Sequence, residues 1–141
     1  KIIFEPGRSI IGNTGVLISK VIYIKPGSKK NFIILDAAMN DLMRPALYGA
    51  EHEIIPEKKT NQFADKTYEF VGPICESTDK FMTSKKFQKL SEKDLVIISD
   101  VGAYGMSLSS NYNIRLKPPE ILVKGYKTNI IKKRQKLKDL V

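Results

Sequence analysis

The sequence predicts a mainly β fold, a sandwich or barrel built from short strands. Runs rich in β-branched and other apolar residues recur along the chain, and glycine, proline and polar residues separate them. Few stretches show the apolar period of a helix, and there are no internal repeats. With 141 residues, 42% of them hydrophobic, the chain is long enough to bury one core.

The first part of the chain predicts a β-hairpin. Residues 1–4 form a short apolar run, and 9–17 mix glycine and asparagine with apolar residues, which favours a short helix or an irregular turn. Residues 16–25 are rich in β-branched side chains, and 31–36 are again apolar. Because Pro26, Gly27 and Ser28 break the chain between them, these two runs should pair as a hairpin.

Beyond residue 36 the pattern alternates between short strands and short helical turns. A turn of helix is expected at 40–48, stopped or bent at Pro45. A second short helix is expected at 103–110, where small residues surround Met106. Further strands are predicted where short apolar runs lie between turns, at 52–55, 67–71, 92–99 and 120–124.

The formal net charge of +9 and the lysine-rich segment 124–141 raise the question of nucleic-acid binding. Apolar residues interrupt these lysines at the spacing of a strand followed by a short surface helix, at Ile130, Ile131, Leu137 and Leu140. A solvated charged face is the more common meaning of such a run, so nucleic acid is not the expected partner. The positive field would also attract anions such as phosphates and dicarboxylates.

Composition also bears on location. No apolar run approaches the roughly 20 residues that a membrane span needs, and no charged-then-apolar leader opens the chain. The single cysteine gives no reason to expect an oxidising compartment. We therefore expect a soluble, cytoplasmic protein that has no membrane partner.

The one cysteine, Cys75, lies in the segment Gly-Pro-Ile-Cys-Glu-Ser-Thr-Asp at 72–79. Gly72 and Pro73 break the backbone just after a strand-like run, so Cys75 and Glu76 should lie at the exposed end of a strand, where functional groups often gather. An isolated cysteine is more often a small buried hydrophobe. Residue chemistry alone leaves both interpretations open.

Four segments together resemble motifs of the pyridoxal-phosphate-dependent basic amino-acid decarboxylases, the family with the alanine-racemase-like fold type. They occur in the order of that family and span nearly the whole chain. The segments are Glu5-Pro6-Gly7-Arg8, Arg44-Pro45-Ala46-Leu47-Tyr48, the run 72–79, and Gly102-Ala103-Tyr104-Gly105-Met106 followed by Ser109-Ser110-Asn111-Tyr112-Asn113. The Cys75-Glu76 pair favours the branch that acts on diaminopimelate, since ornithine and arginine relatives typically carry Cys-Asp there.

The resemblance implies the architecture of a C-terminal β-barrel or sandwich domain of a fold-type III decarboxylase. Residues 1–15 would be a remnant of the last strand of the (β/α)8 barrel and its connection, and 16–141 the C-terminal domain. The family's cofactor-holding lysine, its histidine and its glycine-rich phosphate loop have no match here, since His52 follows the arginine motif. We therefore expect part of a longer enzyme, inactive alone, that is a fragment, a split-gene product or a gene remnant.

The activity implied is decarboxylation of meso-2,6-diaminopimelate to L-lysine with pyridoxal 5'-phosphate. Cys75 would be the catalytic residue, because a thiol is a suitable acid for reprotonating the carbon that has lost carbon dioxide. Glu76 would bind the distal ammonium of the substrate. Without the resemblance, an exposed glutamate in a loop is usually only solvated.

The remaining assignments concern the cofactor and the substrate. Arginine binds carboxylates and phosphates with its planar fork, and Tyr48 would share a helix face with Arg44. Alone, either arginine would be interpreted as solvated and Tyr104 as a core aromatic residue, and Tyr112 is a second candidate for such a core position. The resemblance assigns cofactor contacts to Glu5, Pro6, Gly7, Arg8 and Tyr104, and substrate contacts to Arg8, Arg44, Tyr48, Glu76 and Tyr104. No metal site is predicted.

The resemblance also implies partners. In the family the Cys-Glu loop reaches into the active site of the other subunit, so we expect a homodimer with shared sites and a barrel half that completes each one. The alternative is a non-catalytic chain, either a remnant or a domain that binds and regulates a partner.

Overall fold

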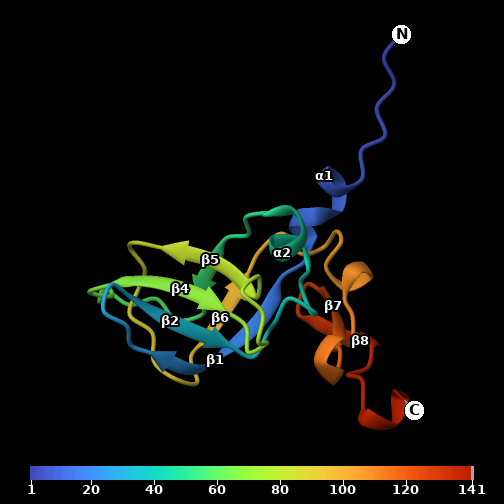
Figure 1. The fold of residues 1–141 in the computed structure, drawn as a ribbon. Helices are drawn as coiled ribbons and strands as arrows, with labels where there is room; N and C mark the ends of the chain where they lie inside the picture. Colours follow the sequence, from blue (N-terminus) through green and yellow to red (C-terminus); the bar gives the residue numbers. More distant parts are fainter. Residues whose placement is uncertain (141) are drawn as a thin grey trace.

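The computed structural model describes residues 1–140, and its main unit is a curled six-stranded sheet (Figure 1). The strands are β1 (Leu17–Lys25), β2 (Lys30–Leu35), β3 (Ile54–Pro56), β4 (Thr67–Val71), β5 (Lys80–Ser84) and β6 (Leu95–Ile98). They pair in the order β3-β6-β1-β2-β4-β5. Only β2 and β4 run parallel among these neighbours. The mainly β prediction is confirmed.

The predicted hairpin forms from β1 and β2, which pair antiparallel with Lys25 opposite Phe32. The sequence did not indicate β5, which pairs antiparallel with β4 at the edge of the sheet. Phe81 is the only buried residue of β5, and its neighbour Met82 is partly buried, followed by threonine and serine. A five-residue edge strand whose two apolar side chains are adjacent, and not alternating, carries too little period-2 pattern to be recognised alone.

The core is apolar and is formed by side chains on the concave face of the curled sheet. Phe70 of β4 is fully buried and its ring lies edge-on to Phe87, with 4.8 Å between the ring centroids. Its other principal members are also fully or almost fully buried: Val21, Ile33, Leu35, Leu42, Val96 and Ile98. This core holds the strand ends from which the functional segments emerge.

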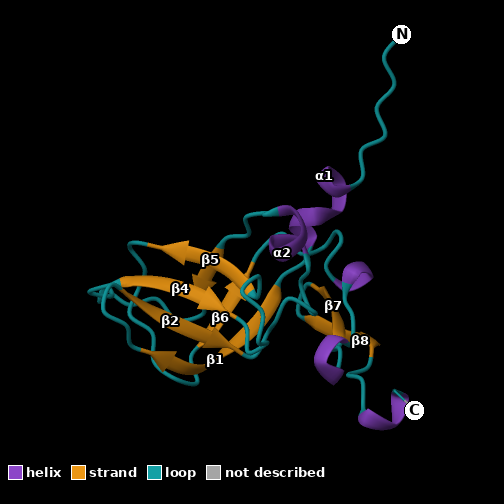
Figure 2. Ribbon diagram, viewed as in Figure 1, coloured by secondary structure: helices purple, strands orange, loops and turns teal. Residues whose placement is uncertain are grey.

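A separate two-stranded hairpin, β7 (Glu120–Lys124) and β8 (Lys127–Lys132), lies beside the sheet and is followed by the turn η4 (Leu137–Asp139) (Figure 2). Gly125 adopts φ +59° in the tight turn, a conformation that favours glycine. The predicted strand at 120–124 and the predicted strand and short surface helix after it are confirmed. The hairpin leaves five large apolar side chains exposed: Ile121, Leu122, Val123, Ile130 and Ile131.

The N-terminal residues 1–6 form no strand and project from the body of the molecule (Figures 1 and 2). The expected strand at 1–4 therefore has no neighbour to pair with, and Ile2, Ile3 and Phe4 are 80%, 74% and 82% exposed. The predicted short helix follows as α1 (Arg8–Ile11) and η1 (Gly12–Thr14). A division of the chain at residue 15 stays a prediction.

The other short helices are α2 (Arg44–Tyr48), η2 (Met106–Leu108) and η3 (Tyr112–Ile114). The prediction that Pro45 stops or bends a helix was wrong, because α2 begins at Arg44 and Pro45 lies in its first turn. The amides of a first turn have no partner within the helix, so proline costs nothing there. Gly49, with φ +62°, ends the helix instead. Within residues 1–140, no helix has the length and apolar character to cross a bilayer.

Candidate active site

Two tyrosine rings flank the guanidinium of Arg44. Its Cζ lies 5.8 Å from the ring centroid of Tyr48 and 5.9 Å from that of Tyr104. The helix α2 explains the first contact, since residues four apart share a helix face as predicted. Nε of Arg44 is buried and has no hydrogen-bond partner within residues 1–140. Arg44, Tyr48 and Tyr104 therefore form one group, the arginine cluster, with a buried donor still unsatisfied.

Close backbone packing brings Tyr104 to this cluster. The amide of Gly102 donates to the carbonyl of Gly12 at 2.9 Å, and a Cβ on Gly102 would lie only 2.1 Å from the carbonyl oxygen of Ile11. Tyr104 itself adopts φ +58°, an unusual conformation for a residue with a Cβ. Its ring is half exposed. The turn thus presents the ring outward on a backbone that is packed against the segment after α1.

The Glu5-Pro6-Gly7-Arg8 motif lies beside the same tyrosine. A Cβ placed on Gly7 would lie 3.9 Å from the hydroxyl of Tyr104. The carbonyl of Gly7 accepts a hydrogen bond from the amide of Ile10 at 3.0 Å, which closes a turn at the start of α1. All four motif residues are exposed, and within residues 1–140 neither Arg8 nor Arg44 forms an ion pair with a carboxylate. The described residues hold no cluster that could bind a metal ion.

The Cys75-Glu76 pair lies in a second place, on the turn between β4 and β5. Cys75 is exposed and unpaired, as the Gly-Pro break after the strand predicted, so it is not a buried hydrophobe. Glu76 is exposed as well, and its Oε1 accepts a hydrogen bond from the hydroxyl of Tyr112. That bond raises the pKa of Tyr112, because Glu76 holds the proton in place. The hydroxyl of Tyr112 therefore keeps its proton and orients the carboxylate.

The prediction that Tyr112 is a core aromatic residue was wrong, since the residue is 45% exposed. Sequence reasoning missed its contact with Glu76, which joins residues 36 positions apart. It also assigned no role to Asp79, although Asp79 closes the same motif. Sequence spacing could not reveal the contact of Tyr112 with Glu76 or the contact of Asp79 with the amide of Met39, because both depend on how separate loops pack together.

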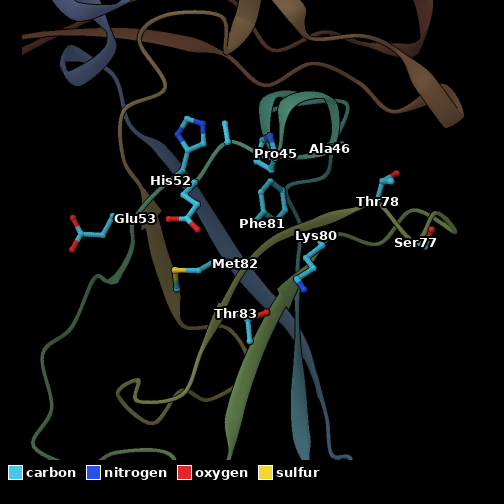
Figure 3. A pocket seen from close by; sticks show the side chains of 13 residues that line it. Pro45, Ala46, His52, Glu53, Ser77, Thr78, Lys80, Phe81, Met82 and Thr83 are labelled. Atoms are coloured by element: carbon cyan, nitrogen blue, oxygen red, sulfur yellow. The ribbon is translucent and has the colours of Figure 1, made fainter.

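The two groups do not touch: in the part of the chain that the structure describes, no hydrogen bond, ion pair or ring contact joins Cys75 or Glu76 to the arginine cluster. A cavity of about 670 Å³ lies between the two elements that carry them. Pro45 and Ala46 of α2 and Ser77 and Thr78 of the turn line this cavity (Figure 3).

His52 also lines this cavity, although its side chain is buried (Figure 3). Nδ1 lies 2.9 Å from the carbonyl oxygen of Ser99, to which it must donate, because a carbonyl only accepts. Nε2 is buried and without a partner within residues 1–140. The only histidine is therefore a core residue of this domain and not a surface acid or base.

Known proteins share this sequence and this architecture. Residues 10–102 match the model of the family "Pyridoxal-dependent decarboxylase, C-terminal sheet domain". Diaminopimelate decarboxylase from Vibrio cholerae is 47% identical over 140 residues, which covers 99% of this chain and 33% of that protein. The crystal structure of diaminopimelate decarboxylase from M. jannaschii has a TM-score of 0.91 at 39% identity, covering 96% of this chain and 31% of that chain.

The diaminopimelate decarboxylase from Helicobacter pylori, crystallised with L-lysine, has a TM-score of 0.87 at 42% identity and covers 96% of this chain and 33% of that one. The present chain thus spans about a third of the length of the relatives it matches. Because the family model matches well over half of the 141 residues, the chain belongs to the pyridoxal-dependent decarboxylases and forms their C-terminal sheet domain.

Proposed function

We propose that this chain is the C-terminal part of a diaminopimelate decarboxylase, which converts meso-2,6-diaminopimelate to L-lysine and carbon dioxide. The observation that carries the proposal is the similarity to diaminopimelate decarboxylases over at least 96% of the chain, at 47% identity for the V. cholerae protein. The Cys75-Glu76 pair of that branch is exposed on a turn, where a ligand can reach it.

Arg8 and the arginine cluster together fit two anionic groups, the phosphate of pyridoxal 5'-phosphate and a carboxylate of the substrate. Arg8 and Arg44 carry positive charges without a carboxylate partner among the described residues, and Nε of Arg44 is a buried donor that still needs an acceptor. Phosphate or carboxylate oxygens are the acceptors that arginine binds best. When bound, the cofactor supplies an electron sink for the loss of carbon dioxide.

The residues of this chain then have distinct tasks. Gly7, Arg8 and Tyr104, with Glu5 and Pro6 in the same turn, would contact the cofactor phosphate and ring. Arg44 would bind a substrate carboxylate, with Tyr48 and Tyr104 packed against its guanidinium. Tyrosine faces hold a guanidinium in place through cation–π attraction, which leaves its N–H groups free for the ligand.

Cys75 would act after carbon dioxide has left, and Glu76 would bind the distal end of the substrate. The thiol would hold a proton and deliver it to the α-carbon after decarboxylation. Glu76, oriented by Tyr112, would accept hydrogen bonds from the distal ammonium of diaminopimelate. A carboxylate at a fixed distance distinguishes this substrate from shorter diamino acids.

The separation of the two groups supports a homodimer with shared sites. One subunit would supply the arginine cluster to its own cofactor and Cys75 with Glu76 to the cofactor of its neighbour. The exposed apolar residues at 2–4 and on the β7–β8 hairpin would be covered by the barrel half of the enzyme, since apolar surfaces of this kind mark interfaces. We expect the complete enzyme to work in the cytoplasm.

Co-expression with the complementary two-thirds of the V. cholerae enzyme tests the proposal. Carbon dioxide release from diaminopimelate should require both polypeptides, because only the barrel half brings the lysine that holds the cofactor. This chain alone, mixed with cofactor and dialysed, should show neither a retained cofactor absorbance band nor turnover. A stable but inactive complex would favour a non-catalytic, partner-binding role instead, and turnover by this chain alone would contradict the expected dependence on the barrel half.

Glu76→Asp should shift the preference among substrates in the assembled enzyme. The shortened carboxylate retreats from the distal ammonium, so kcat/KM for diaminopimelate should fall on the order of tenfold relative to that for ornithine. Glu92→Asp is a matched control, because Glu92 is an exposed glutamate on another turn. Equal losses for both substrates would contradict the assignment of Glu76 to the distal ammonium.

A further inference from the structure

The turn that carries Cys75 and Glu76 is built around a buried carboxylate. Asp79 is 3% exposed, although it lies in a turn whose preceding residues are open to solvent. Its Oδ2 accepts a hydrogen bond from the amide of Ile74 at 2.8 Å, and its Oδ1 accepts one from the amide of Met39 at 2.7 Å. One side chain therefore bonds to the turn itself and to a segment 40 residues away.

Gly72 closes the other side of this carboxylate. Its amide donates to the backbone carbonyl of Asp79 at 3.0 Å, which joins the two ends of the turn. A Cβ on Gly72 would lie 2.2 Å from Oδ2 of Asp79, so no side chain fits at this position. Cys75 and Glu76 are thus held on a loop that is fastened at its base by Asp79.

The segment at 39–40, whose Met39 amide donates to Oδ1 of Asp79, also contacts the residues around Tyr112 and leads to Arg44. Asn40, next to Met39, is fully buried, and its Nδ2 donates to the carbonyl of Ser110 at 3.2 Å. Its Oδ1 accepts a hydrogen bond from Nε of Arg115 at 2.9 Å. This connects the segment to the residues around Tyr112, and α2 begins with Arg44 four positions after Asn40. Hydrogen bonds therefore fasten the 39–40 segment to the Cys75-Glu76 turn and to residues 110–115, and the chain continues from this segment into α2.

We infer that Asp79 is a positioning residue, which fixes the turn bearing Cys75 and Glu76 against the segment that leads to Arg44. The catalytic consequence rests on the proposed decarboxylase function, whereas the fixing of the turn does not. Loss of the double acceptor frees the amides of Ile74 and Met39 and lets the turn move away. Displacement of a reacting group by about 1 Å is enough to lower a rate severely.

The protonation state of Asp79 provides a measurable signature. Burial raises the pKa of Asp79, against the opposing effects of the amides of Ile74 and Met39 and the charge of Arg115. The folded chain binds this proton more tightly than the unfolded chain, so the contribution of the group to stability falls as pH rises from its ordinary pKa through the raised one. Protonation converts one carboxylate oxygen of Asp79 to a hydroxyl, which weakens the hydrogen bond that this oxygen accepts from a backbone amide.

An NMR titration of the unmodified chain tests the contact without any substitution. The amide proton shifts of Ile74 and Met39 should change together, with one midpoint above the ordinary value of about 3.9. Asp79→Asn keeps the size of the side chain but leaves a single carbonyl acceptor, so hydrogen exchange of at least one of the two amides should accelerate about tenfold or more. Independent titration of the two amides, or no titration, would overturn the inference.

Two control variants separate positioning from general destabilisation. Asp94→Asn makes the same chemical change at the 91–94 turn, where Oδ2 of Asp94 accepts from the amide of Ser91 at 2.7 Å, and should leave Ile74 and Met39 unchanged. Val96→Ala removes buried volume from the core and should accelerate exchange throughout the chain.

In the enzyme assembled with the barrel half, Asp79→Asn should lower kcat about tenfold and raise KM less than threefold, because the displaced turn carries the proton donor, whereas of the binding groups only Glu76 moves with it. Asp94→Asn should leave both constants within twofold. Suppose that Asp79→Asn accelerates exchange of the Ile74 and Met39 amides but has the same kcat as Val96→Ala. Asp79 then only stabilises the fold, and the inference is wrong. If the unsubstituted complex is inactive, the proposed function fails, while the titration still decides whether Asp79 holds the turn.

Discussion

Cys75→Ala should lower kcat of the assembled enzyme by roughly 100-fold to 10,000-fold, which is the usual contribution of a general acid. The exposed thiol can give a proton to a carbon centre, whereas Oε1 of Glu76 acts as an acceptor for the hydroxyl of Tyr112. Because proton delivery matters in the transition state and not in substrate binding, KM should change little.

Product analysis gives a second readout for the same variant. In D2O the carbon that loses carbon dioxide becomes a CHD group, and without an oriented donor the deuterium adds from either face, so the lysine formed should lose its single-face deuterium selectivity at Cε. Cys75→Ser is the matched variant, because it keeps the size of the side chain but replaces the thiol by a much weaker acid. If either variant keeps its kcat and raises only KM, Cys75 is a binding or packing residue.

The strands that could be predicted from the sequence are those with long apolar runs. Residues 16–25 and 31–36 form the β1–β2 hairpin because two β-branched stretches flank a Pro-Gly-Ser break. β5 was missed because its pairing with β4, and not its own pattern, makes it a strand. The apolar run at 1–4 shows the converse, since it remains unpaired without a neighbouring strand.

In the candidate site, too, local features could be predicted from the sequence, whereas contacts between distant residues could not. Local spacing predicted that Tyr48 shares a face with Arg44 and that Cys75 lies exposed after β4. The contacts of Glu76 with Tyr112 and of Asp79 with Met39 span 36 and 40 positions, respectively. No local pattern encodes such contacts, because they exist only once the sheet has brought the loops together.

Arg44→Gln should raise KM for diaminopimelate by roughly 30-fold to 1,000-fold, since truncating one partner of a buried charged pair costs about 2–4 kcal/mol. Nε of Arg44 is buried without a partner within residues 1–140, and the proposed substrate carboxylate would complete its hydrogen bonding, so the loss should fall mainly on binding. Glutamine keeps a polar side chain of moderate length but removes the charge and the fork. Initial-rate kinetics on the assembled enzyme measure the effect.

Arg44→Lys distinguishes the two ways in which this cation could act. Lysine keeps the positive charge but cannot bind a carboxylate in bidentate fashion or stack its head group on Tyr48 and Tyr104 as a guanidinium does. We therefore expect it to recover only a small part of the KM lost in Arg44→Gln. Arg134→Lys, at an exposed position of the C-terminal segment, should leave the kinetics unchanged and serves as the control. If Arg44→Lys restores KM fully, Arg44 acts as a point charge, and the substrate carboxylate must bind elsewhere.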